Sequence, residues 1–136
     1  MSYIQKEIKD SVLIISLDAP GEKVNTLNEA MMEQFSSLLE EADSDSTIKG
    51  IVLISRKDDN FIAGADIEMF KARSTAQEMQ QLSWDGHQVL SKIATSKKPI
   101  VVAIHGSCMG GGLELSLACH YRIASKHPKT IFALPE

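Results

Sequence analysis

Two loops rich in small residues are the places where this chain could bring its backbone close to a ligand. The first is segment 61–66, Phe-Ile-Ala-Gly-Ala-Asp, with small side chains at three successive positions. The second is segment 106–112, Gly-Ser-Cys-Met-Gly-Gly-Gly. Small residues let a main chain approach another group closely. Taken alone, the first loop is more typical of an ordinary turn than of a binding site.

The second loop stands between a predicted buried strand, 100–104, and a short predicted helix that ends near Ala118. Ligands collect at such positions in open α/β sheets, and the free amides of a helix N-terminus favour negative charge. No Gly-Lys-Ser/Thr follows the glycines, and the spacing does not fit Gly-x-Gly-x-x-Gly. The loop is therefore only weak evidence for phosphate binding.

Apolar strands alternate with helices along the chain. We expect strands at 12–17, 50–54, 100–104 and 121–124, each rich in β-branched or apolar residues. Runs without polar alternation are typical of strands covered on both faces. The alternation with helices predicts α/β layering with mostly parallel central strands.

Two long helices are predicted between these strands. Thr26 with Glu29, and Thr75 with Glu78, have the spacing of capping boxes at their starts. Residues at helical spacing should form a buried stripe on each helix. For the first helix these are Met31, Phe35, Leu38, Leu39 and Ala42, and for the second they are Met79, Leu82, Val89, Leu90 and Ile93.

Length and composition bound the remaining possibilities. The 136 residues suffice for one domain, and the net charge of −4 with no basic run longer than Lys97-Lys98 argues against nucleic-acid binding. Two cysteines are too few for a disulfide framework or a zinc site, and we expect no bound metal. The start resembles neither a signal nor a transit peptide. We expect a cytoplasmic protein or, alternatively, one of the mitochondrial matrix.

Four motifs in order resemble the crotonase (enoyl-CoA hydratase/isomerase) superfamily: Asn25-Thr26-Leu27-Asn28, the two loops, and Leu134-Pro135-Glu136. The amino-acid sequence of segment 103–115 is most similar to the hydratase domain of the multifunctional alpha subunit of fatty-acid oxidation complexes. The resemblance implies a ClpP/crotonase-type α/β spiral of repeated β-β-α units. It also implies that residues 1–136 are the N-terminal part of a longer hydratase/isomerase domain, truncated at the second acidic motif.

The resemblance implies an enoyl-CoA hydratase of fatty-acid β-oxidation, with Δ3–Δ2 isomerisation as a side activity. The backbone N–H groups of Ala65 and Gly111 would form an oxyanion hole for the thioester oxygen. Glu114 and Glu136 would be the catalytic acid and base, and the sequence leaves the division of their roles open. Without the motifs, Glu114 is equally explained as a carboxylate favoured at a helix N-terminus, and Glu136 as a solvated chain end.

Coenzyme A would bind, by the same resemblance, along the first loop and near the chain segment that precedes the first helix. The residues concerned are Ala63, Gly64, Asp66, Ile67 and Lys23. Met69, Phe70 and Met109 are candidates for the acyl-chain pocket, although methionines at such positions are more often ordinary core. The four histidines show no metal-ligand spacing, and we interpret them as structural.

Hydration needs no cofactor, and NAD would be required only if a dehydrogenase region follows. The expected partners are an acyl-CoA substrate and either further copies of the chain or a thiolase beta subunit. We expect the isolated 136 residues to be weakly active or inactive. Two alternatives are kept: a non-catalytic acyl-CoA-binding or assembly module of the same fold, and a Clp-type peptidase with Ser107 as nucleophile and His120 or His127 as base. No nucleophile-elbow pattern surrounds Ser107.

Overall fold

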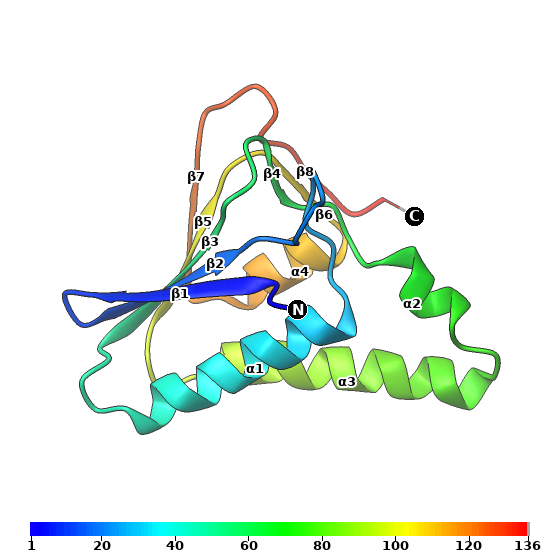
Figure 1. Cartoon of the computed structure of the whole chain (residues 1–136), viewed down its shortest axis with the longest axis horizontal. Coiled ribbons are helices and arrows are strands. Elements are labelled where there is room, and N and C mark those ends of the chain that lie inside the picture. The colour runs from blue at the N-terminus through cyan, green and yellow to red at the C-terminus, as the bar shows by residue number, and fades with distance from the viewer. Residues whose placement is uncertain (136) are drawn as a thin grey trace.

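The computed structural model describes residues 1–135, which fold into two sheets and four helices (Figure 1). The larger sheet has the strand order β1-β2-β3-β5-β7. Its strands are β1 (Ile4–Lys9), β2 (Val12–Leu17), β3 (Gly50–Ser55), β5 (Ile100–Ile104) and β7 (Tyr121–Ala124). β1 runs antiparallel to β2, and every other pairing in this sheet is parallel.

A smaller parallel sheet, in the order β4-β6-β8, lies beside the large one. It consists of β4 (Asn60–Ile62), β6 (Ser107–Met109) and β8 (Phe132–Ala133). The helices are α1 (Glu29–Ser44), α2 (Ile67–Lys71), α3 (Ala76–Ala94) and α4 (Gly111–Ala118). Figure 1 shows α1 and α3 lying along one side of the molecule, with α4 between them and the small sheet.

The chain repeats one unit: a strand of the large sheet, a short strand of the small sheet, and then a helix. The order β3-β4-α2-α3 is one such unit, and β5-β6-α4 is the next. An earlier unit runs from β2 to α1, and in it a single parallel bridge between Leu27 and Ala65 stands in the place of the short strand. This arrangement is the predicted spiral of β-β-α units.

Apolar burial holds the large sheet together. Alternate residues of β2 and β3 face α1 and α3 and are almost fully excluded from solvent, among them Leu13, Ile15 and Leu53. Phe35 and Leu39 of α1 complete this core. Because burying such a side chain stabilises a fold by about 1.5–3 kcal/mol, this layer dominates the stability. The predicted strands of this sheet are confirmed.

The structure corrects the predicted start of α1. Thr26 and Glu29 do not form a capping box; Asn28 is the N-cap, and its side chain accepts a hydrogen bond from the Met31 N–H at 2.8 Å. The bridge between Leu27 and Ala65 keeps the chain extended up to residue 27, so the helix begins only after it. The predicted capping box of Thr75 and Glu78 on α3 is confirmed.

The predicted buried stripe of α3 is also wrong for most of its length. Only Ile93 is buried, whereas Met79 is 40% exposed and Leu82, Val89 and Leu90 are half-buried. These apolar side chains line an open cavity instead of the closed core.

In the described part of the chain, no helix combines the length and the hydropathy that crossing a bilayer requires.

Candidate active site

The two glycine-containing loops meet in space. Gly64 and Gly110 both adopt positive φ angles, +119° and +51°, which L-residues with side chains rarely adopt. A Cβ atom placed on Gly110 would lie 3.9 Å from the Gly64 Cα, and one on Gly64 would lie 3.9 Å from the Met109 carbonyl oxygen. The two loops therefore pass so close to each other that a single added Cβ atom would be enough to reach the opposite backbone.

The bridge to Leu27 fixes the orientation of Ala65. The Leu27 N–H donates to the Gly64 carbonyl at 2.9 Å, and the Asp66 N–H donates to the Leu27 carbonyl at 2.8 Å. The bridge leaves the N–H of Ala65 itself unused. Gly111 is the first residue of α4, where helix geometry supplies no acceptor for the N–H. Within residues 1–135, neither of these two amides donates a hydrogen bond.

Close packing explains the glycines that follow. A Cβ on Gly112 would lie 2.6 Å from the Ile62 Cβ, so α4 can only start against β4 if this residue has no side chain. A Cβ on Gly111 would lie 3.0 Å from the Leu27 Cδ1 and 3.9 Å from the Glu114 Oε2. The Glu114 carboxylate therefore lies close to the backbone that presents the Gly111 amide.

Two buried asparagines hold the loops in place. The Asn25 side chain accepts from the Ala19 N–H at 2.9 Å and donates to the Phe61 carbonyl at 3.1 Å. The Asn25 N–H donates to the Asn60 Oδ1 at 2.7 Å, and the Asn60 side chain donates to the Ser107 Oγ at 2.7 Å. This network joins the segment before α1, the start of β4 and the start of β6. The sequence interpretation missed it, although two asparagines beside apolar strands were the available signal.

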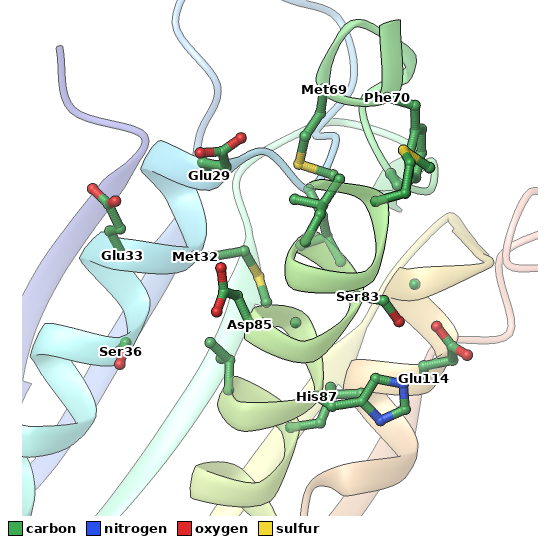
Figure 2. A pocket seen from close by; sticks show the side chains of 18 of the residues that line it. Glu29, Met32, Glu33, Ser36, Met69, Phe70, Ser83, Asp85, His87 and Glu114 are labelled. Carbon is green, nitrogen blue, oxygen red and sulfur yellow. The ribbon is translucent and has the colours of Figure 1, made fainter. Parts of the chain in front are cut away.

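A cavity of about 810 Å³ opens where α1, α3 and α4 face one another. Ala65, Gly111 and Glu114 all line it, so the structure brings three of the predicted site residues to one place. Glu114 projects from the first turn of α4, and its N–H donates to the Gly110 carbonyl at 3.0 Å. Figure 2 shows its carboxylate on the α4 side of the cavity.

Apolar side chains form most of the remaining wall. Figure 2 shows Met32 of α1 and Met69 and Phe70 of α2 around the cavity. Of the three residues predicted for an acyl-chain pocket, Met69 and Phe70 line this cavity and Met109 does not. The partly exposed α3 residues described above complete this wall.

The residues predicted to bind coenzyme A lie outside the cavity lining. The Ala63 N–H donates to the Asn25 carbonyl at 2.8 Å, and the Asp66 side chain caps α2 by accepting from the Glu68 N–H. Ile67 is 66% exposed, and Lys23 is also exposed. Their role in coenzyme A binding stays a prediction.

Glu136, the second predicted catalytic carboxylate, lies outside the described residues. Three histidines have structural contacts: the His120 Nδ1 accepts from the Ile100 N–H at 3.0 Å, the His127 Nδ1 accepts from the Lys129 N–H, and His105 bonds Ser125. His87 differs, because it lines the cavity.

Residues 1–135 contain neither a grouped set of metal ligands nor a hydrogen-bonded serine–histidine pair. Among residues 1–135, no three His, Cys, Asp or Glu side chains are grouped so that they could hold a metal ion. The Ser107 Oγ accepts from Asn60, and in the same residues no hydrogen bond joins Ser107 to a histidine. This arrangement does not favour the peptidase alternative.

The repeated β-β-α spiral, with two free amides at the meeting point of its loops, defines the crotonase class of fold. The chain belongs to the enoyl-CoA hydratase/isomerase family, whose family model matches residues 7–136. The crystal structure of an enoyl-CoA hydratase from Geobacillus kaustophilus HTA426 is similar over 100% of this chain and 50% of its own, with a TM-score of 0.91 and 26% identity. An enoyl-CoA hydratase/carnitine racemase from Magnetospirillum magneticum is similar with a TM-score of 0.90 and 29% identity, over 99% and 50% of the two chains.

The curated sequence relatives are much longer than this chain. The chain is 47% identical over 127 residues to the fatty acid oxidation complex subunit alpha of Shewanella halifaxensis, and 48% identical to that of Shewanella baltica. These matches cover 93% of this chain but only 18% of either relative.

Proposed function

We propose that this chain supplies an enoyl-CoA hydratase site of fatty-acid β-oxidation, which adds water to trans-2-enoyl-CoA in the syn sense and gives 3-hydroxyacyl-CoA. One observation carries the proposal: the unused amides of Ala65 and Gly111 and the carboxylate of Glu114 belong to the wall of the same cavity. The family of the chain and the names of its relatives support the same reaction.

The two amides fit the electrostatic demand of the reaction. When the water oxygen bonds to C3, the electron pair of the C2–C3 double bond moves toward the thioester, and negative charge collects on its oxygen. Donors that are fixed before the reaction stabilise this enolate, and one such donor is worth about 3–4 kcal/mol in a hydrolase. Ala65 is held by its bridge and Gly111 by the helix start, so both donors are preorganised.

Glu114 is the proposed base for the water. In this scheme its carboxylate takes one water proton as the new C3–O bond forms, and an acid then delivers a proton to C2 of the enolate. We assign this second step to Glu136 on the basis of the sequence motif. With both glutamates present, hydration is the main activity of the proposal and Δ3–Δ2 isomerisation its side activity.

Adding water to the double bond involves no net oxidation or reduction, so the hydratase site requires no redox cofactor. A role for NAD belongs to the proposal only for a protein that also carries a dehydrogenase region. Because the relatives are named alpha subunits of a fatty acid oxidation complex, a thiolase beta subunit is the proposed protein partner, with self-association as the alternative. Residues 1–136 would form the N-terminal part of the hydratase domain.

The test is Glu114→Gln in the complete polypeptide that the gene encodes, assayed by the loss of enoyl thioester absorbance with crotonyl-CoA. Glutamine keeps the shape but cannot accept the water proton, and we expect turnover to fall by about 10²-fold or more while acyl-CoA still binds. Glu22→Gln, an exposed change outside the cavity, is the control.

Unchanged turnover in Glu114→Gln would remove this residue from the mechanism. Binding of acyl-CoA by a wild-type protein that shows no turnover would instead support the non-catalytic module.

A further inference from the structure

All four histidines were interpreted from the sequence as structural, but His87 lacks the hydrogen bonds that the other three make. It lies on α3 and lines the same cavity as Ala65, Gly111 and Glu114. α3 packs against α4, and Figure 2 shows the imidazole of His87 and the carboxylate of Glu114 directed to the same part of the cavity. Within residues 1–135, no hydrogen bond involves its ring nitrogens.

The charges around this cavity make His87 distinctive. The other ionisable side chains of its described wall are acidic: Glu29, Glu33, Asp85 and Glu114. Glu29 pairs with Arg73, and Asp85 accepts a hydrogen bond from Gln81 at 2.8 Å. Figure 2 shows the α1 glutamates and Asp85 on the opposite side of α3 from His87. In the described wall, His87 is the one side chain that offers an N–H donor; the other side-chain donors there are the hydroxyl groups of Ser36, Ser37 and Ser83.

Water that attacks C3 needs a donor as well as a base. One lone pair of its oxygen forms the new C–O bond, and one proton leaves toward Glu114. The second lone pair is free to accept a hydrogen bond, which fixes the direction of attack. A carboxylate accepts hydrogen bonds and cannot supply this one, whereas an imidazole N–H can.

We propose that His87 binds the reacting water together with Glu114, and in the reverse direction binds the 3-hydroxyl group of the product. This inference rests on the proposed hydratase function. His87 is neither consumed nor required to transfer a proton; its N–H orients the oxygen that attacks C3. The ligand chemistry is that of a 3-hydroxyacyl thioester, with the hydroxyl held between α3 and α4.

The test compares three variants of the complete polypeptide: His87→Leu, His87→Gln and the control Gln88→Leu. Gln88 is exposed on the same helix and does not line the cavity. Losing one hydrogen bond to the reacting water should lower kcat of His87→Leu about tenfold. KM should change less than about twofold, because the interaction acts on the attacking water rather than on substrate binding. His87→Gln keeps an N–H donor and should recover most of the lost kcat.

Several results would overturn the inference. If His87→Leu folds and matches Gln88→Leu in kcat, His87 does not bind the water. If His87→Leu fails to fold, His87→Gln decides: a kcat within about threefold of the wild type supports donation by the side chain, and a larger loss contradicts it. Absence of turnover in the wild-type protein would contradict the hydratase proposal itself and remove the inference with it.

Discussion

The two sheets of this molecule are stabilised in different ways. The large sheet is held by apolar side chains such as Leu13, Ile15 and Leu53, all almost fully buried. The small sheet is held by buried amide side chains and by backbones that touch at glycines. Only the small sheet leads directly into the candidate site, because β4 precedes Ala65 and β6 precedes Gly111.

Apolar packing is non-directional, so a core that loses a methyl group becomes less stable but still buries the same face. Hydrogen bonds and glycine contacts are directional and fail over fractions of an ångström. A pair of amides that must converge on one oxygen therefore needs the second kind of support.

The largest expected effect is that of Gly106→Ala, at the entry to β6. Gly106 has a φ of +83°, and a Cβ atom there would lie 2.0 Å from the Asp59 carbonyl carbon and oxygen. Because both obstacles are backbone atoms, the strand itself must move. We expect the free energy of unfolding to fall by more than about 4 kcal/mol, measured by chemical denaturation.

Gly21→Ala is the matched control for that change. Gly21 also has a positive φ, +73°, but nothing lies within 4 Å of an added Cβ. It should cost only about 1–2 kcal/mol, the penalty of the left-handed backbone alone. Equal losses in the two variants would contradict the importance of the contact between Gly106 and Asp59.

Asn25→Ala weakens the support of the small sheet and Leu53→Ala that of the large sheet, with similar expected losses of stability. Each should reduce the free energy of unfolding by about 3 kcal/mol, the first by leaving buried backbone groups unpaired and the second by opening a cavity. Their local effects should differ. Asn25→Ala should shift the amide NMR signals of residues 63–66, whereas Leu53→Ala should leave them in place. Identical shifts in both variants would show that the two layers are not separately supported.

A smaller effect is expected at the start of α1. Asn28→Ala removes the N-cap acceptor and should cost about 1 kcal/mol. Thr26→Ala should stay within about 0.5 kcal/mol, because the Thr26 side chain makes no cap in this structure. Denaturation of the two variants would separate the observed cap from the one that the sequence pattern predicted; a larger loss for Thr26→Ala would reverse the assignment.

The smallest effect concerns an exposed ion pair beside the small sheet. The hydrogen bond from Lys129 holds the pKa of the Asp59 carboxyl below its usual value of 3.8. A lowered pKa in the folded state means that the pair stabilises the protein above that value and ceases to do so as the pH falls through the lowered pKa. The difference in melting temperature between the wild type and Asp59→Asn should therefore be small at pH 7 and vanish in acid. A difference that grows in acid would contradict the assignment.

The sequence predicted the large sheet well because its signals are local. Apolar, β-branched runs identified β2, β3, β5 and β7, and the capping box located the start of α3. It did not predict β1, whose residues are mostly exposed, or β4 and β6, each of which has three residues. Strands this short carry little periodicity. They form only by pairing with strands that are distant in the sequence, so no local signal marks them.

The candidate site was predictable only as a set of motifs. Ala65, Gly111 and Glu114 were named from their resemblance to a family pattern, and the structure brings them to one cavity. No signal in the sequence indicated that His87 lines this cavity, because a single histidine on a helix has no distinctive spacing. The α3 stripe was misassigned because an apolar helix face looks the same in sequence whether it lines a core or a cavity.

The most direct test of the central claim is a crystal structure of the complete polypeptide with an unreactive acyl-CoA thioester. We expect the thioester oxygen to lie within about 3.1 Å of the amide nitrogens of both Ala65 and Gly111, with the Glu114 carboxylate facing C3. A thioester oxygen that contacts neither amide, or only one of them, would contradict it.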